Sequence, residues 1–482
     1  MKYISLLLVI LLTIFDAFAL SLLEFSKEKY ITKNSEPAVK CLARECKSRG
    51  VDENFVIVDV TLPEAGTLAR ELGERINKVD SLVVRGSVND EDFYTMWSAS
   101  FYGQLTVLNL EHAIIENGVV PEKAFWKAQE QMAPDMSFYY SIWLRKIILP
   151  GNTEEIGKSA FAYAKDLEDV VLPSSLRIIR TMAFANCSKL KTNPLIFDEG
   201  LEMIEEQVFF NCIKLREVVF PSSLRELGDY VFRGSSVSKV VIPEGLEVLG
   251  EGAFYGSRLE EVALPNSCQE VRGSDHFALN YQLERMHLPD GWVEIPAGFA
   301  EDCIALKEVN IPSTVKVINA NAFASCLSIK SLDLPEGLTE LGQAAFSGCS
   351  SIETLCLPVS VSVLQPGSCA MSGLREIYSK ATVPPLCKGN SNFRTPFDSN
   401  GSGPFSSPVY VPVGCGEAYK LAPGWDSFSH FIEVDDFPFV GVEDVRCVSD
   451  DKGTVYDLMG RKIDKAFPGQ IYIRNGKKML SE

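Results

Sequence analysis

The chain has 482 residues, of which 46% are hydrophobic and 23% charged, and its formal net charge at pH 7 is −18. No block of basic residues occurs along it. An acidic chain without a basic cluster is a poor match for the phosphate backbone of nucleic acids or for an anionic membrane surface, so we expect neither as a partner.

The first 19 residues have the pattern of a secretory signal peptide. Lys2 precedes an apolar run from Ile4 to Phe15, and Ala17-Phe18-Ala19 forms a small-residue cleavage pattern. No other stretch approaches 18 consecutive apolar residues, so we expect no transmembrane segment in the mature chain. Residues 20–54 follow as an N-terminal segment of unassigned role. The sequence therefore predicts an exported protein, located at the cell surface or outside the cell.

A short phrase that ends in Leu-Pro or Ile-Pro recurs along the middle of the chain. Pro289, Pro312, Pro335 and Pro358 follow one another at steps of 23 residues. A fixed period of this size predicts a solenoid, because one unit cannot bury its apolar edge alone and stacked units make a continuous core. The clear repeats span 144–380, and divergent N-terminal repeats or a cap precede them over residues 55–143.

Each repeat predicts one short strand and one return path. Alternate apolar residues before the proline face inward, and the proline ends the strand because it cannot donate a ladder hydrogen bond. The Ser and Gly residues that follow make a turn, and a second apolar run such as Leu338-x-x-Leu341 returns along the outside of the coil. We expect a buried column of the repeat phenylalanines, namely Phe161, Phe184, Phe209, Phe232, Phe254, Phe277, Phe299, Phe323 and Phe346.

Most central cysteines occupy one repeat position. Cys187, Cys212, Cys326 and Cys349 each lie three residues after the repeat phenylalanine, and Cys303 lies four after it. We therefore expect them to be buried thiols that pack as small apolar residues under the coil. Equivalent positions of adjacent turns are only ~4.8 Å apart, so disulfides between turns stay open as the alternative.

The repeat stops after Ser379. Residues 381–440 contain Val409-Tyr410-Val411-Pro412 and the aromatic residues Tyr419, Trp425 and Phe428, which predict a strand and an aromatic cluster in a C-terminal cap. Residues 441–482 contain alternating segments on either side of Asn475-Gly476, which predict a hairpin in a small β tail.

The sequence offers no catalytic or metal-binding constellation. The four histidines, His112, His276, His287 and His430, have no metal-ligand spacing, and no H-E-x-x-H, G-x-S-x-G or C-x-x-C motif occurs. We therefore expect no catalytic residues, no bound metal and no cofactor, and an enzyme is the least favoured interpretation.

Strand alternation identifies the residues that face outward. With Val170 and Leu172 inside, Asp169 and Val171 point to solvent. The outer face should carry a charged row beside a row that is apolar as far as Ala263 and polar from His287 onward. The apolar row has two interpretations. β-Branched residues are favoured at exposed strand positions whether or not anything binds there, and a contiguous apolar row is also typical of an interaction site. The candidate partner-binding face consists of Lys146, Ile148, Asp169, Val171, Glu217, Val219, Lys239, Val241, Glu261, Ala263, Arg285, His287, Glu308 and Asn310.

The frame L-x-x-V-x-L followed by Leu-Pro and Ala-Phe-x-x-Cys resembles the BspA-like leucine-rich repeat surface proteins of Bacteroidetes and other mucosal microbes. The resemblance implies a right-handed leucine-rich repeat coil with a parallel β-sheet on one face, irregular N-terminal repeats and a C-terminal β cap. The position after the strand, usually Asn or Cys, is mostly Ser, Gly or Thr here, so the asparagine ladder of ordinary leucine-rich repeats should be absent. The tail is similar to C-terminal sorting domains of Bacteroidetes secretion, with a small β-module packed on the cap as the alternative.

The resemblance also implies a role in adhesion. We expect a non-catalytic protein-binding protein of the bacterial cell surface or secreted space, which contacts a host matrix protein or another cell-surface protein through the sheet face. The alternative is a carbohydrate- or nutrient-binding surface protein. That function would need exposed aromatic residues on the face, where the sequence offers only Tyr378 at the end.

Overall fold

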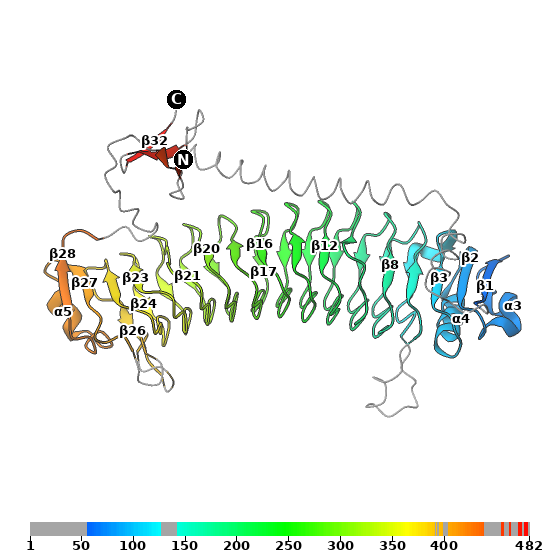
Figure 1. The fold of residues 1–482 in the computed structure, drawn as a ribbon, viewed down its shortest axis with the longest axis horizontal. Coiled ribbons are helices and arrows are strands. Elements are labelled where there is room, and N and C mark those ends of the chain that lie inside the picture. Colours follow the sequence, from blue (N-terminus) through cyan, green and yellow to red (C-terminus); the bar gives the residue numbers. More distant parts are fainter. Residues whose placement is uncertain are drawn as a thin grey trace. The chain divides into compact units, whose positions relative to one another are not determined.

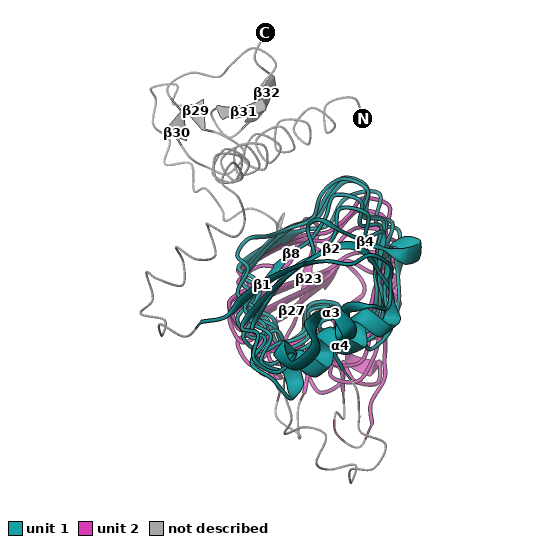
Figure 2. Cartoon of the chain, turned by 90° about the vertical axis from the view of Figure 1, so that its right-hand side faces the viewer, with its two compact units in different colours: residues 1–280 teal, residues 281–482 magenta. Residues whose placement is uncertain are grey.

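The computed structural model describes residues 55–126, 142–390, 392, 395–398 and 403–437, together with four short strands of the tail. The expected signal peptide and the segment 20–54 lie outside the described residues. The chain divides into two compact units, residues 1–280 and residues 281–482 (Figure 2). Parallel strands dominate both units, and the predicted solenoid is confirmed.

Unit 1 begins with a module that combines strands and two short helices (Figure 1). Asn89 caps helix α4, and its side chain accepts hydrogen bonds from the amides of Glu91 and Asp92. The buried Asp92 carboxylate accepts from the amides of Asn89, Gly66 and Leu68, so it ties the start of α3 to the start of α4. The elements are β1 (Ile57–Thr61), α3 (Leu68–Leu72), the 3-10 turn Gly73–Arg75, β2 (Ser81–Val88), α4 (Asp90–Phe101), β3 (Val107–Asn109), β4 (Ala113–Ile115) and the 3-10 turn Glu116–Gly118.

The repeats of unit 1 form two rows of parallel strands. The first row holds the strands predicted before each Leu-Pro, and it continues the sheet β1-β2-β3. Its members are β6 (Lys146–Ile148), β8 (Asp169–Val171), β10 (Leu195–Ile196), β12 (Glu217–Val219), β14 (Lys239–Val241) and β16 (Glu261–Ala263). The second row lies on the return path as β5 (Val119–Val120), β7 (Glu155–Ile156), β9 (Ile178–Ile179), β11 (Met203–Ile204), β13 (Glu226–Leu227), β15 (Val248–Leu249) and β17 (Glu270–Val271).

The second row was not foreseen as a sheet. Its seven strands pair continuously from β5 to β17, although each has only two residues. In each of the two-residue strands β7, β9, β11, β13 and β15, the second residue is buried and the first is half-buried. The sequence pattern Leu-x-x-Leu marked this path as a return segment, and the structure shows that it is itself a parallel ladder.

Unit 2 repeats the same turn. Its first row holds β18 (Arg285–His287), β20 (Glu308–Asn310), β23 (Thr354–Leu357), β25 (Glu376–Ser379), β27 (Val409–Pro412) and β28 (Phe431–Val434). Its second row holds β19 (Glu294–Ile295), β21 (Val317–Ile318), β22 (Glu340–Leu341), β24 (Val363–Leu364) and β26 (Leu386–Cys387). Helix α5 (Gly416–Leu421) connects β27 to β28, and the tail carries β29 (Val455–Tyr456), β30 (Lys462–Ile463), β31 (Ile471–Arg474) and β32 (Lys477–Leu480).

Two predictions about the C-terminal region are confirmed. The segment Val409–Pro412 is a strand, and Tyr419, Trp425 and Phe428 are buried beside it. Trp425 Nε1 donates to the carbonyl of Pro385 over 3.0 Å, which anchors the aromatic cluster to the last repeat. In the tail, β31 and β32 pair in antiparallel register with Arg474 opposite Lys477, which agrees with the predicted hairpin.

Stacked phenylalanines form the core of each unit. All nine repeat phenylalanines are fully buried, as predicted. In unit 1 the rings from Phe161 to Phe277 stack with centroids 5.1–5.6 Å apart. Phe125 extends the column by one ring, 5.2 Å from Phe161. Burial of each ring contributes roughly 1.5–3 kcal/mol, so the column is a major source of stability.

The chain bends sharply on both sides of the repeat phenylalanines. In the turns from Phe161 to Phe346, except that of Phe299, the residues two before and two after the ring adopt positive φ, for example Gln207 (58°) and Asn211 (55°) around Phe209. Around Phe299 the pattern is shifted by one residue, to Gly298 and Asp302. The left-handed region costs an ordinary side chain about 1–2 kcal/mol, while Asn and Gly tolerate it well. This geometry explains why the second position after the phenylalanine is Asn or Gly in five of the turns, at Asn186, Asn211, Gly234, Gly256 and Gly348.

The repeat cysteines are buried thiols, as predicted, and they also donate hydrogen bonds. The Cys212 thiol donates to the carbonyl of Phe184 over 3.3 Å, and the Cys349 thiol donates to that of Phe323 over 3.1 Å. Ser257 and Asn280 occupy the same position and donate to the carbonyls of Phe232 and Phe254. Every cysteine in the described part of the chain is a free thiol. In these turns a single side-chain donor thus adds a hydrogen bond to a carbonyl of the neighbouring turn.

Hydroxyl groups take the place of the asparagine ladder. Ser223 donates to the carbonyl of Leu201 over 2.8 Å, and Thr314 donates to that of Trp292 over 2.7 Å. Ser175, Ser267 and Ser360 make the equivalent bond one turn back. The one asparagine at this position, Asn152, bonds both the amide and the carbonyl of Ile115. The expected absence of an asparagine ladder therefore reflects a substitution of donors.

The thiol donors lead to a stability prediction. The variant Cys212→Ser should unfold at nearly the same temperature, because Ser257 already fills the equivalent position. The variant Cys212→Ala should lose about 0.5–1.5 kcal/mol of unfolding free energy, because the carbonyl of Phe184 loses one of its two donors and keeps the amide of Cys187. Thermal unfolding of both variants checks this, with Cys415→Ala, at a half-buried position, as the control. Equal destabilisation by Ser and Ala would show that the thiol acts only by packing.

His276 gives the fold a pH dependence. Its side chain is fully buried, and Nε2 lies 2.8 Å from the carbonyl oxygen of Arg272, which can only accept. Burial lowers the pKa of His276 from 6.5 to about 4. The unfolded chain therefore binds a proton that the folded chain does not between these pH values.

We predict that unfolding free energy is unaffected by His276 above about pH 6.5 and falls progressively toward pH 4, by about 3 kcal/mol. Unfolding curves measured between pH 7 and pH 4 test this in the wild-type chain and in His276→Gln, which keeps a side-chain N–H donor. The variant should show a shallower loss over this range. Parallel pH profiles for the two proteins would contradict the assignment.

Candidate binding face

The predicted alternation holds along the first row of both units. Ile147, Val170, Val218, Val262 and Met286 are buried at the middle of their strands. All fourteen residues of the candidate face lie at half-buried or exposed positions. Ten belong to unit 1 and four to unit 2, and each group is considered within its own unit.

In unit 1 the apolar row runs along two sets of paired strands, β6-β8 and β10-β12-β14. Ile148 lies opposite Val171 across β6 and β8, and Val219 lies opposite Val241 across β12 and β14. Val171 has the greatest exposure, 43%. Sequence reasoning missed Ile196. This residue pairs in register with Val219 and belongs to the turn between those of Val171 and Val219. The missed signal was Leu195-Ile196, which lacks the usual Leu-Pro ending.

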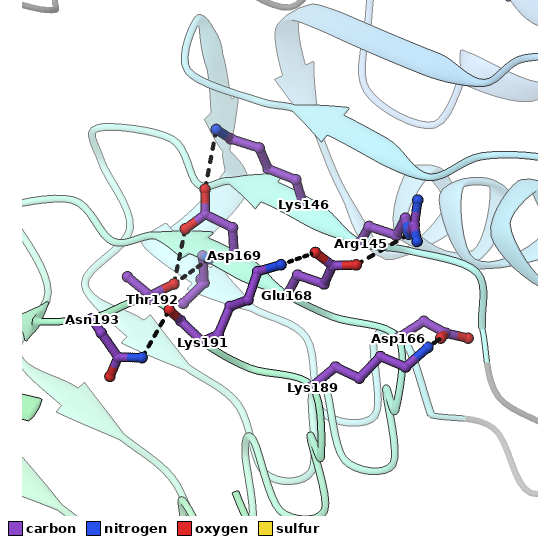
Figure 3. Close-up of polar contacts among 10 residues, drawn as sticks. Arg145, Lys146, Asp166, Glu168, Asp169, Lys189, Lys191, Thr192 and Asn193 are labelled. Carbon is purple, nitrogen blue, oxygen red and sulfur yellow. Dashed lines mark hydrogen bonds and ion pairs between the residues drawn. The ribbon is translucent and has the colours of Figure 1, made fainter. Parts of the chain in front are cut away.

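The charged row beside it neutralises itself. Lys146 Nζ lies 3.1 Å from Asp169 Oδ2, and Lys239 Nζ lies 3.7 Å from Glu217 Oε1. A further ladder at the strand entrances joins Arg145 and Lys191 to Glu168 (Figure 3). Such exposed pairs contribute about 0–1 kcal/mol each to stability. They leave little free charge next to the apolar row.

Side chains close the face where the strand ladder is interrupted. No strand pairing joins β8 to β10. Thr192 Oγ1 accepts from the amide of Val170 over 3.2 Å and donates to Asp169 Oδ1 over 2.8 Å (Figure 3). Asn193 Oδ1 accepts from the amides of Arg216 and Glu217, which follow on the next turn. These two side chains replace the missing main-chain bonds and keep the surface continuous.

The four face residues of unit 2 are polar, as predicted. Arg285 pairs in register with Glu308, and His287 pairs with Asn310, across β18 and β20. The Asn310 side chain accepts from the amide of Leu288 over 2.9 Å, so part of its polarity serves the backbone. Partial burial lowers the pKa of His287, against the opposing charge of Asp290.

Sequence reasoning missed an aromatic pair at the far end of the unit 2 face. Tyr378 on β25 stacks on Tyr410 on β27, with ring centroids 4.3 Å apart and an interplanar angle of 10°. Burial and the nearby Glu376 raise the pKa of Tyr378. The alternation of residues 376–379 placed Tyr378 on the outer face. Tyr410 follows an irregular segment, so the repeat period could not predict which residue it lies opposite.

The described residues bring together no set of three or more His, Cys, Asp or Glu side chains suited to hold a metal ion. None of the helices in the described ranges is both long and apolar enough to cross a membrane.

Comparisons with solved structures agree with this architecture. A leucine-rich repeat protein from Bacteroides ovatus is 22% identical over 80% of this chain and 93% of its own, with a TM-score of 0.51, which shows the shared fold. A leucine-rich cell surface protein from Faecalibacterium prausnitzii (21% identity, 51% and 76% coverage, TM-score 0.36) is more distantly similar. The pneumococcal vaccine antigen PcpA is similar at 19% identity, with 74% and 80% coverage and a TM-score of 0.39.

No curated protein matches the chain. The model of the BspA-type leucine-rich repeat region matches residues 131–194, 191–296 and 270–389, which together make up more than half of the 482 residues. These are the turns that carry the stacked phenylalanines, the thiol donors and the two strand rows. The chain belongs to the family of BspA-type leucine-rich repeat proteins.

Proposed function

We propose that this protein is a non-catalytic binding protein, exported and displayed at the bacterial surface or released, which contacts another protein through the first-row face of unit 1. The observation that carries the proposal is the apolar row Ile148, Val171, Ile196, Val219 and Val241, flanked by charges that pair with each other. A contiguous apolar strip with a neutralised border resembles the core and rim of a protein interface.

The electrostatics of the border favour a protein partner. Lys146 and Asp169 satisfy each other, as do Lys239 and Glu217, so covering them does not leave an unpaired charge. The partner we propose is a host matrix protein or another cell-surface protein. Export is supported by the signal-peptide pattern of residues 1–19 and by family membership.

A second candidate function is carbohydrate or nutrient binding. The stacked Tyr378–Tyr410 pair at the end of the unit 2 face favours it, since it adds an aromatic residue that the sequence did not reveal there. Aromatic side chains offer apolar surface with a polar end, which suits amphipathic ligands. A glycan array probed with the wild-type chain and with Tyr410→Ala tests this candidate, and loss of any signal in the variant would support it.

The first proposal predicts the effect of charges in the apolar row. The triple variant Val171→Lys, Val219→Lys and Val241→Lys should bind its partner at least a hundredfold more weakly, because three unpaired charges at an interface each cost about 1–3 kcal/mol. The chain should remain folded, since all three side chains reach solvent. Capture of matrix and surface proteins by immobilised residues 20–482 is the measurement.

A matched control places the same charges on the second row. Ile178, Met203 and Val248 are half-buried, outward apolar residues of β9, β11 and β15. Their exchange for Lys should leave binding intact. If the first-row variant still captures the partner, or if both triple variants lose it equally, the first-row face of unit 1 is not the binding site.

A further inference from the structure

The first row of unit 2 contains a turn without a strand. The repeat predicts a strand through Ser331, Leu332 and Asp333, yet none forms there. The paired strands stop at β20 and resume at β23, so one turn between them has no strand in this row. Leu332 and Leu334 remain buried, so the turn stays attached to the core and only its main-chain ladder is lost.

A recess opens at this interruption. It has a volume of about 200 Å³ and extends over four successive turns, from Ile311 to Lys380. One part of its wall is aliphatic, with Ile311, Leu334, Pro335 and Pro358, and Cys356 contributes a buried thiol. The rest of the wall is polar, with Ser313, Asp333, Glu336 and Lys380. Pockets for whole small molecules typically measure about 300–1,000 Å³, so this recess suits a single side chain or a similarly small group.

The charges of the recess are unequally satisfied. Lys380 Nζ donates to Glu336 Oε1 over 2.7 Å and thereby neutralises that carboxylate. The Asp333 carboxylate lies exposed at the recess, and no hydrogen bond or ion pair engages it in the described part of the chain. Partial burial raises the pKa of Asp333, an effect that the Lys380 charge opposes. The three groups together leave one uncompensated negative charge at an aliphatic recess.

We propose that the unit 2 recess receives a basic side chain of the protein partner, with the ammonium or guanidinium group on Asp333 and the aliphatic stem against Ile311, Leu334 and Pro335. Basic side chains combine a long apolar stem with a charged head, which matches this arrangement of walls and carboxylate. The proposal rests on the proposed function only in naming a protein as the partner. It adds an anchor point and a preferred chemistry.

Other small ligands fit the recess less well. An anion would meet the unpaired Asp333, while Lys380, the cation of the recess, is already bonded to Glu336. A sugar ring would find no aromatic wall, because the lining residues are aliphatic or polar. The stacked tyrosines lie on β25 and β27 and do not line the recess.

The test uses small probes and the whole mature chain, residues 20–482. N-acetyl-arginine amide and N-acetyl-lysine amide carry one positive charge each, while the citrulline and norleucine analogues have similar shapes without it. Ligand-observed NMR titration should give a Kd on the order of 1–10 mM for the charged probes. The uncharged analogues should bind at least fivefold more weakly.

Two variants at the recess should change the affinity for the charged probes in opposite directions. Asp333→Asn should weaken binding of the charged probes at least fivefold, and Lys380→Met should strengthen it severalfold because Glu336 is then unpaired. Glu308→Gln, an exposed carboxylate on neighbouring β20, is the matched control and should change nothing. Both recess residues reach solvent, so neither change should unfold the chain.

Equal binding of charged and uncharged probes, or an unchanged Kd in Asp333→Asn, would overturn the proposal. So would the absence of any probe binding, or weaker binding of the charged probes in Lys380→Met. Preferential saturation by monosaccharides would assign the recess to a sugar. None of these measurements involves unit 1, so failure of the first-row face and failure of the recess are separately detectable.

Discussion

The structure depends on one constraint: a turn of about 23 residues is too small to satisfy its own main chain, so its polar groups must bond to the next turn. The two strand rows meet most of this demand with parallel ladders. Between the rows, single side chains add to it, with a thiol, hydroxyl or amide beside the phenylalanine in many turns and a hydroxyl after the proline in several. The rings then stack because the ladders hold successive turns in register.

The same constraint explains why the residue type at a repeat position varies while the location of the hydrogen-bond donor within the turn stays the same. Cys212, Ser257 and Asn280 differ in polarity and volume, but each donates one hydrogen bond to the carbonyl of an earlier turn. What matters at this position is a short donor that fits beneath the coil. The residues around each ring vary as well, within the limit that positive φ imposes on side chains such as Gln207 and Asn211.

Much of this architecture could be predicted from periodicity alone. The buried phenylalanines, the inward-facing Val170 and Val218 and the outward Val171 all follow from the position of the Leu-Pro phrase. The second sheet could not be predicted, because two-residue strands carry no alternation that a sequence pattern can reveal. Helices α3 and α4 lie where the repeat has faded, although Asn89 and Asp92 carry a capping-box signal at the start of α4. The pairing of Tyr410 with Tyr378 could not be predicted, because the irregular segment between them does not follow the repeat period.

Two of the interruptions of the first row, after β8 and after β20, show how the chain separates closed surface from open surface. At Thr192 and Asn193 the side chains bond to the amides of neighbouring turns, so the lost ladder is replaced and the face stays continuous. Asn310 likewise turns its amide oxygen toward the amide of Leu288. Asp333 stands one turn after Asn310 in the same row, and in the described part of the chain no hydrogen bond joins its carboxylate to a backbone amide. Side chains do not replace the lost ladder at this turn, so the recess and the Asp333 charge stay open to a binding partner.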